Sequence, residues 1–351
     1  MKGKTLLRLW REGRMPALIR LTRLSGPFYR ACFVASAARH GVLALLADRE
    51  RTFDEIAHAL GVKTDGHETL AAWLRFGVRL GELTQHDGRF ALSGSLARSL
   101  ADPANGSANA ALQEIIRFHS AAILDAPAMA RTGERLTLDD QDGELIAEST
   151  RVIEPFVAEA IDRAIDRAVP TRVLEVGCGS GIYIRELLGR APSAEITGLE
   201  LQDDVAEKAR GNLARWGLGD RVQVRVGDVR NEPPGGGYDL VTLHNNIYYF
   251  AVAERVQLLE RVRRLLAPGG RLLLTTSCLG GNMGLEALSL WFASSSVGGR
   301  LPESEELVAQ MGAAGFEAVE ALSLIPGDKF FCFLARRPQS DVDETHTEEP
   351  K

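Results

Sequence analysis

Short apolar runs alternate with helical patterns along the second half of the chain. The first run is VLEV at 173–176, and similar runs follow at 194–201, 222–226, 238–243 and 265–274. The stretch after the first run, IYIRELLGR at 182–190, has its apolar residues at helical spacing. Continuous apolar strands that alternate with helices are typical of a parallel sheet covered on both faces. The pattern predicts a Rossmann-like α/β domain, followed by two further strands at 319–325 and 329–335.

The first hundred residues predict a different architecture. A long apolar helix is expected at 31–46, a short helix after the capping box of Thr52 and Glu55, and a third helix at 68–80. Alternating residues at 83–92 surround Asp87-Gly88, which is a strong signal for a β-hairpin. Three helices followed by a hairpin predict a winged-helix-like domain over 31–100.

The N-terminal segment at 1–30 combines Leu, Trp and Ile with eight Lys or Arg at roughly helical spacing, with expected breaks at Pro16 and Gly26-Pro27. A helix that lies on a membrane surface would have this composition. An arm that packs on its own domain or on a second subunit would have it too. We favour the arm, because basic residues alone do not identify a membrane.

Composition and charge are those of an ordinary globular protein. Of the 351 residues, 45% are hydrophobic and 25% are charged, and the formal net charge of −6 gives no general attraction to nucleic acid or membranes. The four cysteines lie far apart, and no His and Asp stand at ligand spacing, so neither disulfides nor a metal site is predicted. No apolar run approaches the roughly 18 residues of a membrane span. We expect a cytoplasmic protein without stable membrane insertion, ending in a disordered acidic tail at 338–351.

Three glycines at alternate positions follow the first apolar run: Gly177, Gly179 and Gly181. Such glycines allow positive φ and remove the Cβ atoms that would keep a ligand from the main chain, while the next helix presents free N–H groups. Dinucleotide-binding turns use G-x-G-x-x-G to approach a pyrophosphate. Here the spacing is G-x-G-x-G, and the carboxylate of Glu175 two residues earlier disfavours an anion. NAD binding and a purely structural turn are therefore the less favoured alternatives.

This turn resembles motif I of the class I S-adenosylmethionine (SAM) methyltransferases. Other features follow in the order of that family: Glu200 ends the second strand, Asp228 follows the third, His244 follows the fourth, and LAPGG at 266–270 leads into the fifth. The resemblance implies a seven-stranded Rossmann-like sheet and SAM as the cofactor. It places the following residues at the cofactor: Glu175, Gly177, Gly179, Gly181, Glu200, Leu201, Asp228, Val229 and Asn245.

The predicted winged helix extends the resemblance to small-molecule O-methyltransferases with an N-terminal dimerisation domain. This implies a homodimer that methylates a small aromatic or polyketide-like metabolite. It also implies a basic arm at 1–30, a dimerisation domain at 31–100, connecting helices over the substrate at 101–170 and a SAM-binding domain at 171–337. The helix at 68–80 has no Lys, Asn or Gln to read bases, so we expect no nucleic-acid partner. A winged-helix transcription regulator stays as a less favoured alternative.

Methyl transfer mainly requires alignment of the nucleophile, the methyl group and the sulfur. In the resembled enzymes a His after the fourth strand removes the hydroxyl proton, but Tyr248 stands in that register here, and a tyrosine with a pKa near 10 is a poor base at neutral pH. We assign the catalytic roles to His244 and Tyr248. An acceptor that ionises readily, or a changed chemistry such as hydroxylation or decarboxylation, is also possible. The predicted substrate residues are Asn246, Tyr249, Met283 and Trp291.

Overall fold

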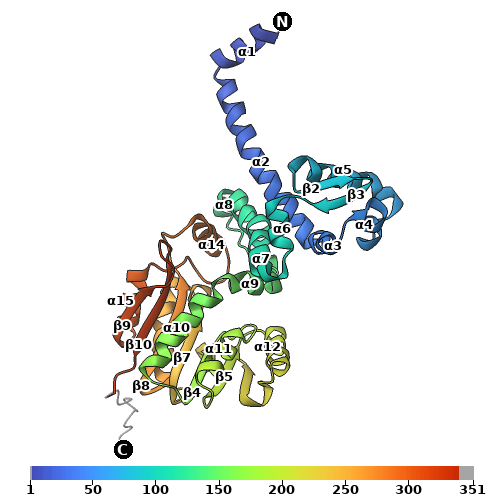
Figure 1. The fold of residues 1–351 in the computed structure, drawn as a ribbon. Coiled ribbons are helices and arrows are strands. Elements are labelled where there is room, and N and C mark those ends of the chain that lie inside the picture. Colours follow the sequence, from blue (N-terminus) through green and yellow to red (C-terminus); the bar gives the residue numbers. More distant parts are fainter. Residues whose placement is uncertain (1, 340–351) are drawn as a thin grey trace, which may run out of the picture. The chain divides into compact units, whose positions relative to one another are not determined.

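The computed structural model describes residues 2–339, and the chain divides into two compact units (Figure 1). The first unit comprises 1–120 and 142–152, and the second comprises 121–141 and 153–351. The predicted connecting region at 101–170 is therefore shared between them. Most of the expected acidic tail at 338–351 lies outside the described residues. Within 2–339, no single helix is long and apolar enough to cross a membrane; one bent pair, Arg14–Arg39 with Val42–Asp48, passes this test by length and composition only.

The first unit combines helices with a small antiparallel sheet in the order β1-β3-β2. The predicted hairpin is confirmed, with Asp87 and Gly88 both at positive φ. The predicted capping box is confirmed as well, between Thr52 and Glu55. The elements of this unit are α1 (Lys2–Arg11), α2 (Arg14–Arg39), α3 (Val42–Asp48), β1 (Arg51–Thr52), α4 (Phe53–Ala59), α5 (His67–Leu80), β2 (Leu83–His86), β3 (Arg89–Leu92), α6 (Ser95–Ala101), α7 (Gly106–Glu114), a π-helical turn (Ile115–His119) and α9 (Gly143–Thr150).

The predicted helix break at Gly26-Pro27 is wrong, because α2 continues through both residues. A proline in a helix interior removes a backbone hydrogen bond and costs about 3 kcal/mol. Packing of the following turns supplies the compensation, since the buried residues of α2 are Phe33, Val34, Ala35 and Ala37. The other break lies at Gly13, with φ 71°, rather than at Pro16. Pro16 instead occupies the first turn of α2, where its missing N–H loses no intrahelical bond.

The second unit contains a seven-stranded sheet in the order β6-β5-β4-β7-β8-β10-β9, which confirms the predicted fold class. The first five strands in this order run parallel, and β10 is antiparallel to both β8 and β9. The strands are β4 (Arg172–Val176), β5 (Glu195–Glu200), β6 (Val222–Val226), β7 (Tyr238–His244), β8 (Leu266–Ser277), β9 (Glu317–Ser323) and β10 (Phe330–Arg336).

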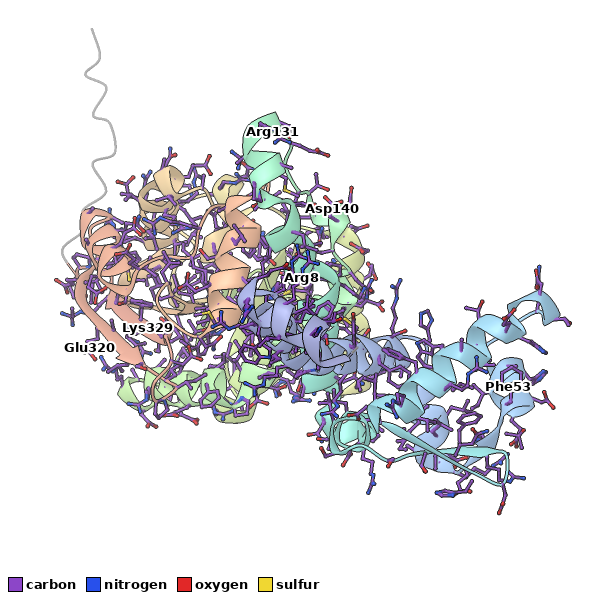
Figure 2. All side chains as sticks on the ribbon, turned by 90° about the horizontal axis from the view of Figure 1, so that it is seen from above. Arg8, Phe53, Arg131, Asp140, Glu320 and Lys329 are labelled. Carbon is purple, nitrogen blue, oxygen red and sulfur yellow. The ribbon has the colours of Figure 1, made fainter. Side chains whose placement is uncertain are left out.

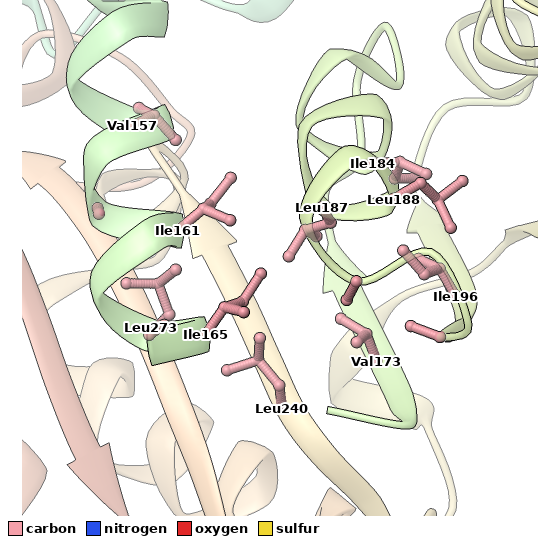
Figure 3. Close-up of a cluster of buried hydrophobic side chains, with 14 of the residues drawn as sticks. Val157, Ile161, Ile165, Val173, Ile184, Leu187, Leu188, Ile196, Leu240 and Leu273 are labelled. Carbon is pink, nitrogen blue, oxygen red and sulfur yellow. The ribbon is translucent and has the colours of Figure 1, made fainter. Parts of the chain in front are cut away.

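The helices of this unit are α8 (Ser120–Thr132), α10 (Glu154–Arg167), α11 (Ile182–Arg190), α12 (Asp203–Arg215), α13 (Arg255–Leu265), α14 (Met283–Ala293) and α15 (Ser304–Ala313). Among them, α10, α12, α13 and α15 contact the strands of the sheet. Helices α10 and α11 share one apolar cluster with the strands, which includes Val157, Ile161, Leu187, Val173, Leu240 and Leu273 (Figure 3). At the end of α10, Arg167 pairs with Glu320 of β9 at 2.6 Å. Glu320 is labelled in Figure 2.

The strand order reverses between β4 and β7. In open α/β sheets, ligands bind beyond the carboxyl ends of the strands at such a reversal. The turns after β4 and β7 hold four of the nine predicted cofactor residues, Gly177, Gly179, Gly181 and Asn245, so the topology brings these four to the expected place.

A buried carboxylate joins the small sheet of the first unit to its helices. Glu82, directly before β2, is only 2% exposed. It accepts a hydrogen bond from the backbone N–H of Ala97 at 3.0 Å and forms an ion pair with Arg30 of α2 at 2.9 Å. Arg30 also donates to the carbonyl of Leu80 at 3.1 Å. Glu82 therefore connects α2, β2 and α6.

We predict that Glu82→Ala lowers the free energy of unfolding by about 2–3 kcal/mol, because the Ala97 N–H and the Arg30 guanidinium lose their common partner. Urea unfolding followed by circular dichroism measures the change. The control is Glu50→Ala, which removes an exposed acid of the same unit and is expected to change stability by less than about 0.5 kcal/mol. Equal stability of the two variants would contradict the connecting role of Glu82.

Candidate cofactor and acceptor site

The glycine turn between β4 and α11 is fastened to the neighbouring strand. The backbone N–H groups of Gly177 and Cys178 both donate to the carbonyl of Leu199 on β5, at 2.7 and 3.1 Å. Gly177, Gly179 and Gly181 all have positive φ, which other residues rarely adopt. A Cβ atom at Gly179 would meet nothing within 4 Å, so the main chain is open there. Gly181 precedes α11 without a side-chain cap, which leaves the N–H groups of the first helical turn available to a ligand.

Glu200, at the end of β5, accepts hydrogen bonds from this turn and from its own chain. One oxygen accepts from the N–H of Gly179 at 2.9 Å. The other accepts from Leu201 and Gln202 at 2.9 and 3.3 Å. These three bonds fix the carboxylate beside the open main chain, where a ligand hydroxyl could donate to it. The Leu201 side chain is 57% exposed at the same strand end.

Glu175 is the most unusual group of the site. Its side chain is 0% exposed, and neither carboxyl oxygen has a hydrogen-bond partner. On the adjacent strands it lies in register with Gly198 of β5 and Thr242 of β7, and the Thr242 hydroxyl also lacks a partner. Burial, and secondarily the charge of Glu200, raise the pKa of Glu175 well above its usual range. A buried carboxyl without a donor is a strong indication of a missing cationic ligand.

The end of β7 brings together further buried polar groups. His244 is 6% exposed, its Nδ1 lies 2.8 Å from the Thr275 hydroxyl, and its ring lies 4.8 Å from that of Tyr183. Nε2 of His244 and Nδ2 of Asn245 have no hydrogen-bond partner. Burial lowers the pKa of His244 to about 3, so this imidazole is neutral at physiological pH. A base with so low a pKa is poorly matched to a hydroxyl proton, which disfavours the predicted catalytic role of His244.

Asn246, which is predicted to be a substrate residue, lies beside the glycine turn. Its side-chain N–H donates to the carbonyl of Val176 at 2.6 Å. A Cβ atom at Gly177 would approach the same nitrogen to 2.9 Å, and the positive φ of Gly177 also favours glycine there. Asn246 therefore connects the end of β7 to the end of β4.

Asp228 follows β6, as the adenine-binding acid of the resembled family does. Its carboxylate forms an ion pair with Arg230 at 2.7 Å and also accepts from the backbone N–H of that residue at 2.9 Å. These hydrogen bonds lower the pKa of Asp228, so the group is ionised at neutral pH. Each carboxylate oxygen can accept more than one donor, so the ion pair leaves capacity for a ligand amino group. The neighbouring Val229 is buried, at 3% exposure.

Two of the four predicted acceptor residues, Tyr249 and Trp291, form an aromatic cluster with Tyr248 around Phe292 of α14. The ring of Phe292 lies 4.7 Å from Tyr248, 5.1 Å from Tyr249 and 5.1 Å from Trp291. Tyr248 and Trp291 are buried, at 5% and 1% exposure, so Trp291 packs in the core of this cluster. Met283 is 79% exposed at the start of α14. Met283 is therefore exposed to solvent, whereas Tyr248 and Trp291 are buried in the cluster.

Two residues of this region were missed at the sequence level. Phe292 is adjacent to Trp291, but nothing in the pattern distinguishes it from ordinary core. Arg255 lies in a helical pattern typical of a solvated face, yet it is 0% exposed and donates to the carbonyls of Phe250 at 3.3 Å and Arg300 at 2.6 Å. Near the latter, the close approach of Gly298 to the Tyr248 carbonyl leaves no room for a Cβ atom.

The chemistry of these residues fits SAM, which carries two cationic groups, a ribose diol and an adenine. The unpartnered Glu175 fits a cation, Glu200 fits hydroxyl donors, and Asp228 fits an amino group. The open main chain at Gly179 allows close approach. Within 2–339, no group of three or more His, Cys, Asp or Glu side chains could hold a metal ion.

Comparisons with known proteins point to the same cofactor. Residues 174–272 match the model of a family described as a methyltransferase domain. Demethylspheroidene O-methyltransferase of Cereibacter sphaeroides is 26% identical over 344 residues, which cover 90% of this chain and 87% of that protein. The enzyme of the same name from Rhodobacter capsulatus is 28% identical over 185 residues, covering 52% of this chain and less than half, 44%, of the relative.

A solved structure shares the whole architecture. Human N-acetylserotonin methyltransferase in complex with SAM superposes with a TM-score of 0.70 at 19% identity, covering 92% of this chain and 98% of the other. At this identity the likeness establishes the fold, and the matched domain adds the cofactor chemistry. The sheet, the glycine turn and the matched domain together support a SAM-dependent methyltransferase with the class I fold.

Proposed function

We propose that this methyltransferase methylates an oxygen atom of a small, aromatic or polyketide-like metabolite. The unpartnered Glu175 beside the open turn at Gly179 carries the cofactor part of the proposal. The relatives named O-methyltransferases support oxygen as the acceptor atom. The rings around Phe292 support an aromatic or similarly flat acceptor, because aromatic side chains pack well on such groups.

When bound, SAM supplies a methyl group already activated by a sulfonium. The residues of the chain then have to hold and align the reactants. We assign Glu175 to a cationic group of SAM, Glu200 to its ribose hydroxyls and Asp228 to its adenine amino group. The backbone at Gly177, Gly179 and Gly181, together with Leu201, Val229 and Asn245, completes the proposed cofactor site.

The acceptor proton needs a separate explanation. His244 is neutral and a weak base, since burial holds its pKa at about 3. We therefore propose that the acceptor carries a hydroxyl that ionises readily, and that Tyr248 orients it from the aromatic cluster. Tyr249 lies beside it, with ring centroids 5.3 Å apart. A SAM-binding enzyme of this fold with changed chemistry is the alternative, and cofactor binding without consumption of methyl groups would support it.

We also propose that the protein is a cytoplasmic homodimer. Large apolar side chains of α1 and α2 are exposed in the single chain, including Leu6, Trp10, Leu18, Leu21, Leu24 and Phe28. Exposed apolar surface of this extent is typical of a protein interface. Phe76 of α5, which is 42% exposed, packs against Tyr29 at 5.9 Å and continues this surface onto the winged-helix-like domain.

Gly179→Arg is expected to abolish SAM binding while the fold persists, because the long side chain fills the open space against the main chain. Calorimetric titration with SAM measures the affinity, and NAD serves as the negative ligand. Gly327→Arg is the matched control, since this glycine also has a positive φ and free space but lies in the turn between β9 and β10. Unchanged affinity in Gly179→Arg would remove the cofactor site from the turn.

Tyr248→Phe is expected to lower kcat about tenfold, the worth of one orienting hydrogen bond, with the affinity for SAM unchanged. The ring packing on Phe292 is retained in this variant. Formation of S-adenosylhomocysteine with a panel of hydroxylated aromatics measures the rate. Tyr238→Phe, at the opposite end of β7, is the control. Full activity of Tyr248→Phe would restrict Tyr248 to packing.

Replacing Leu21 and Leu24 of α2 by Asp is expected to convert a dimer into a monomer, because charges would replace apolar contacts across the interface. Light scattering coupled to size exclusion measures the molecular mass. Leu21 and Leu24 are 61% and 68% exposed; Leu124 of α8, at 78%, is the control position for the same change. A wild-type monomer, or a variant that stays dimeric, would contradict the role given to this helix.

A further inference from the structure

Glu175 lies on β4, which pairs with β5 on one side and β7 on the other, and its carboxyl group is buried. No part of its side chain reaches solvent, and no donor of the described chain lies within hydrogen-bond distance of either oxygen. Thr242 of β7 stands beside it in register, with a hydroxyl that is also unpartnered. On the other side, β5 offers only Gly198, which has no side chain. Among the described residues, none therefore donates a hydrogen bond that would stabilise the ionised form of this carboxyl group.

The titratable groups that face Glu175 do not supply a positive charge. Glu200, at the end of β5, adds a negative charge, and it raises the pKa of Glu175 in the same direction as burial. Burial also raises the pKa of the Cys178 thiol in the turn and of the Tyr183 hydroxyl of α11, so both are neutral. His244 at the end of β7 is neutral as well. An isolated buried carboxylate in such surroundings takes up a proton.

We propose that Glu175 holds a proton in the empty site and releases it when a cationic ligand enters, so that SAM binds in exchange for a proton. The inference rests on the proposed cofactor site and adds its charge balance. The O–H bond of the carboxylic acid breaks, the proton passes to the solvent, and the ligand cation takes its place beside the carboxylate. No oxidation or reduction is involved.

The exchange makes the site selective for cations. An anion does not stabilise the ionised form of Glu175, and the negative charge of Glu200 also repels it. When a cation binds, Glu175 ionises and its carboxylate becomes the negative partner of the cation. Because protons compete with the ligand for Glu175, rising pH strengthens binding over the range in which the free group is protonated.

The test is calorimetric titration of the full chain with SAM at pH 6.5, in buffers that differ in ionisation enthalpy. A proton released on binding is taken up by the buffer, so the observed enthalpy changes linearly with the buffer enthalpy. For the wild type we expect a non-zero slope that corresponds to net proton release, up to one proton per site. The amino group of SAM contributes little, because an α-amino group titrates at about 7.7–8.0 and is already protonated at pH 6.5.

Glu175→Gln keeps the shape of the protonated acid and removes its titration. We expect this variant to fold and to show a slope near zero. Glu195→Gln, at the exposed start of β5, is the matched control and should keep the wild-type slope. Between pH 6 and 7, the wild-type affinity should rise by up to about tenfold, while that of Glu175→Gln stays flat.

The outcomes distinguish a failure of the proton exchange from a failure of the proposed function. Wild-type binding with no dependence on the buffer would overturn the proton exchange and leave the cofactor site intact. The same slope in the wild type and in Glu175→Gln would overturn the assignment to this residue. Absence of any SAM binding by the wild type would instead overturn the proposed function. If Glu175→Gln fails to fold, the wild-type slope still decides whether SAM binding releases a proton.

Discussion

The hydrogen bonds of the Glu200 carboxylate are the interactions on which the rest of the site depends. They hold the turn after β4 and the turn after β5 in one fixed arrangement, through the N–H groups of Gly179 and Leu201. With Glu200 satisfied by main chain, the open backbone at Gly179 keeps its shape without a ligand. Glu175, two residues before the turn, has no such partners. One acid is thus held by main-chain donors, whereas the other is buried without a hydrogen-bond donor.

Sequence patterns were sufficient to predict the elements that depend on neighbouring residues only. The apolar runs predicted every strand of the large sheet, and the spacing of Gly177, Gly179 and Gly181 predicted the turn, because a positive φ requires a particular residue type at a particular position. The unbroken path of α2 through Pro27 was not predictable, since the burial that compensates for the proline lies one to three turns later. Contacts between distant segments decide such cases.

The acceptor side shows the same limit more strongly. Phe292 gathers rings from two segments about forty residues apart in sequence, and its central place follows only from how α14 packs. Arg255 would be read from sequence as a solvated side chain. In the structure it is fully buried, and its donors hold the carbonyls of Phe250 and Arg300, which lie on two different loops. A single sequence does not show that a charged side chain is buried and donates to main-chain carbonyls.

The contact between Gly298 and the Tyr248 carbonyl has a consequence for altering the range of acceptors. Because no side chain fits at Gly298, the loop that carries it cannot be diversified there without displacing the backbone of Tyr248. Phe292 is buried at the centre of its cluster, whereas Tyr249 is only half-buried, so a change of side-chain size is better tolerated at Tyr249. A library aimed at new acceptors is therefore best concentrated on Tyr249, with Gly298 left unchanged.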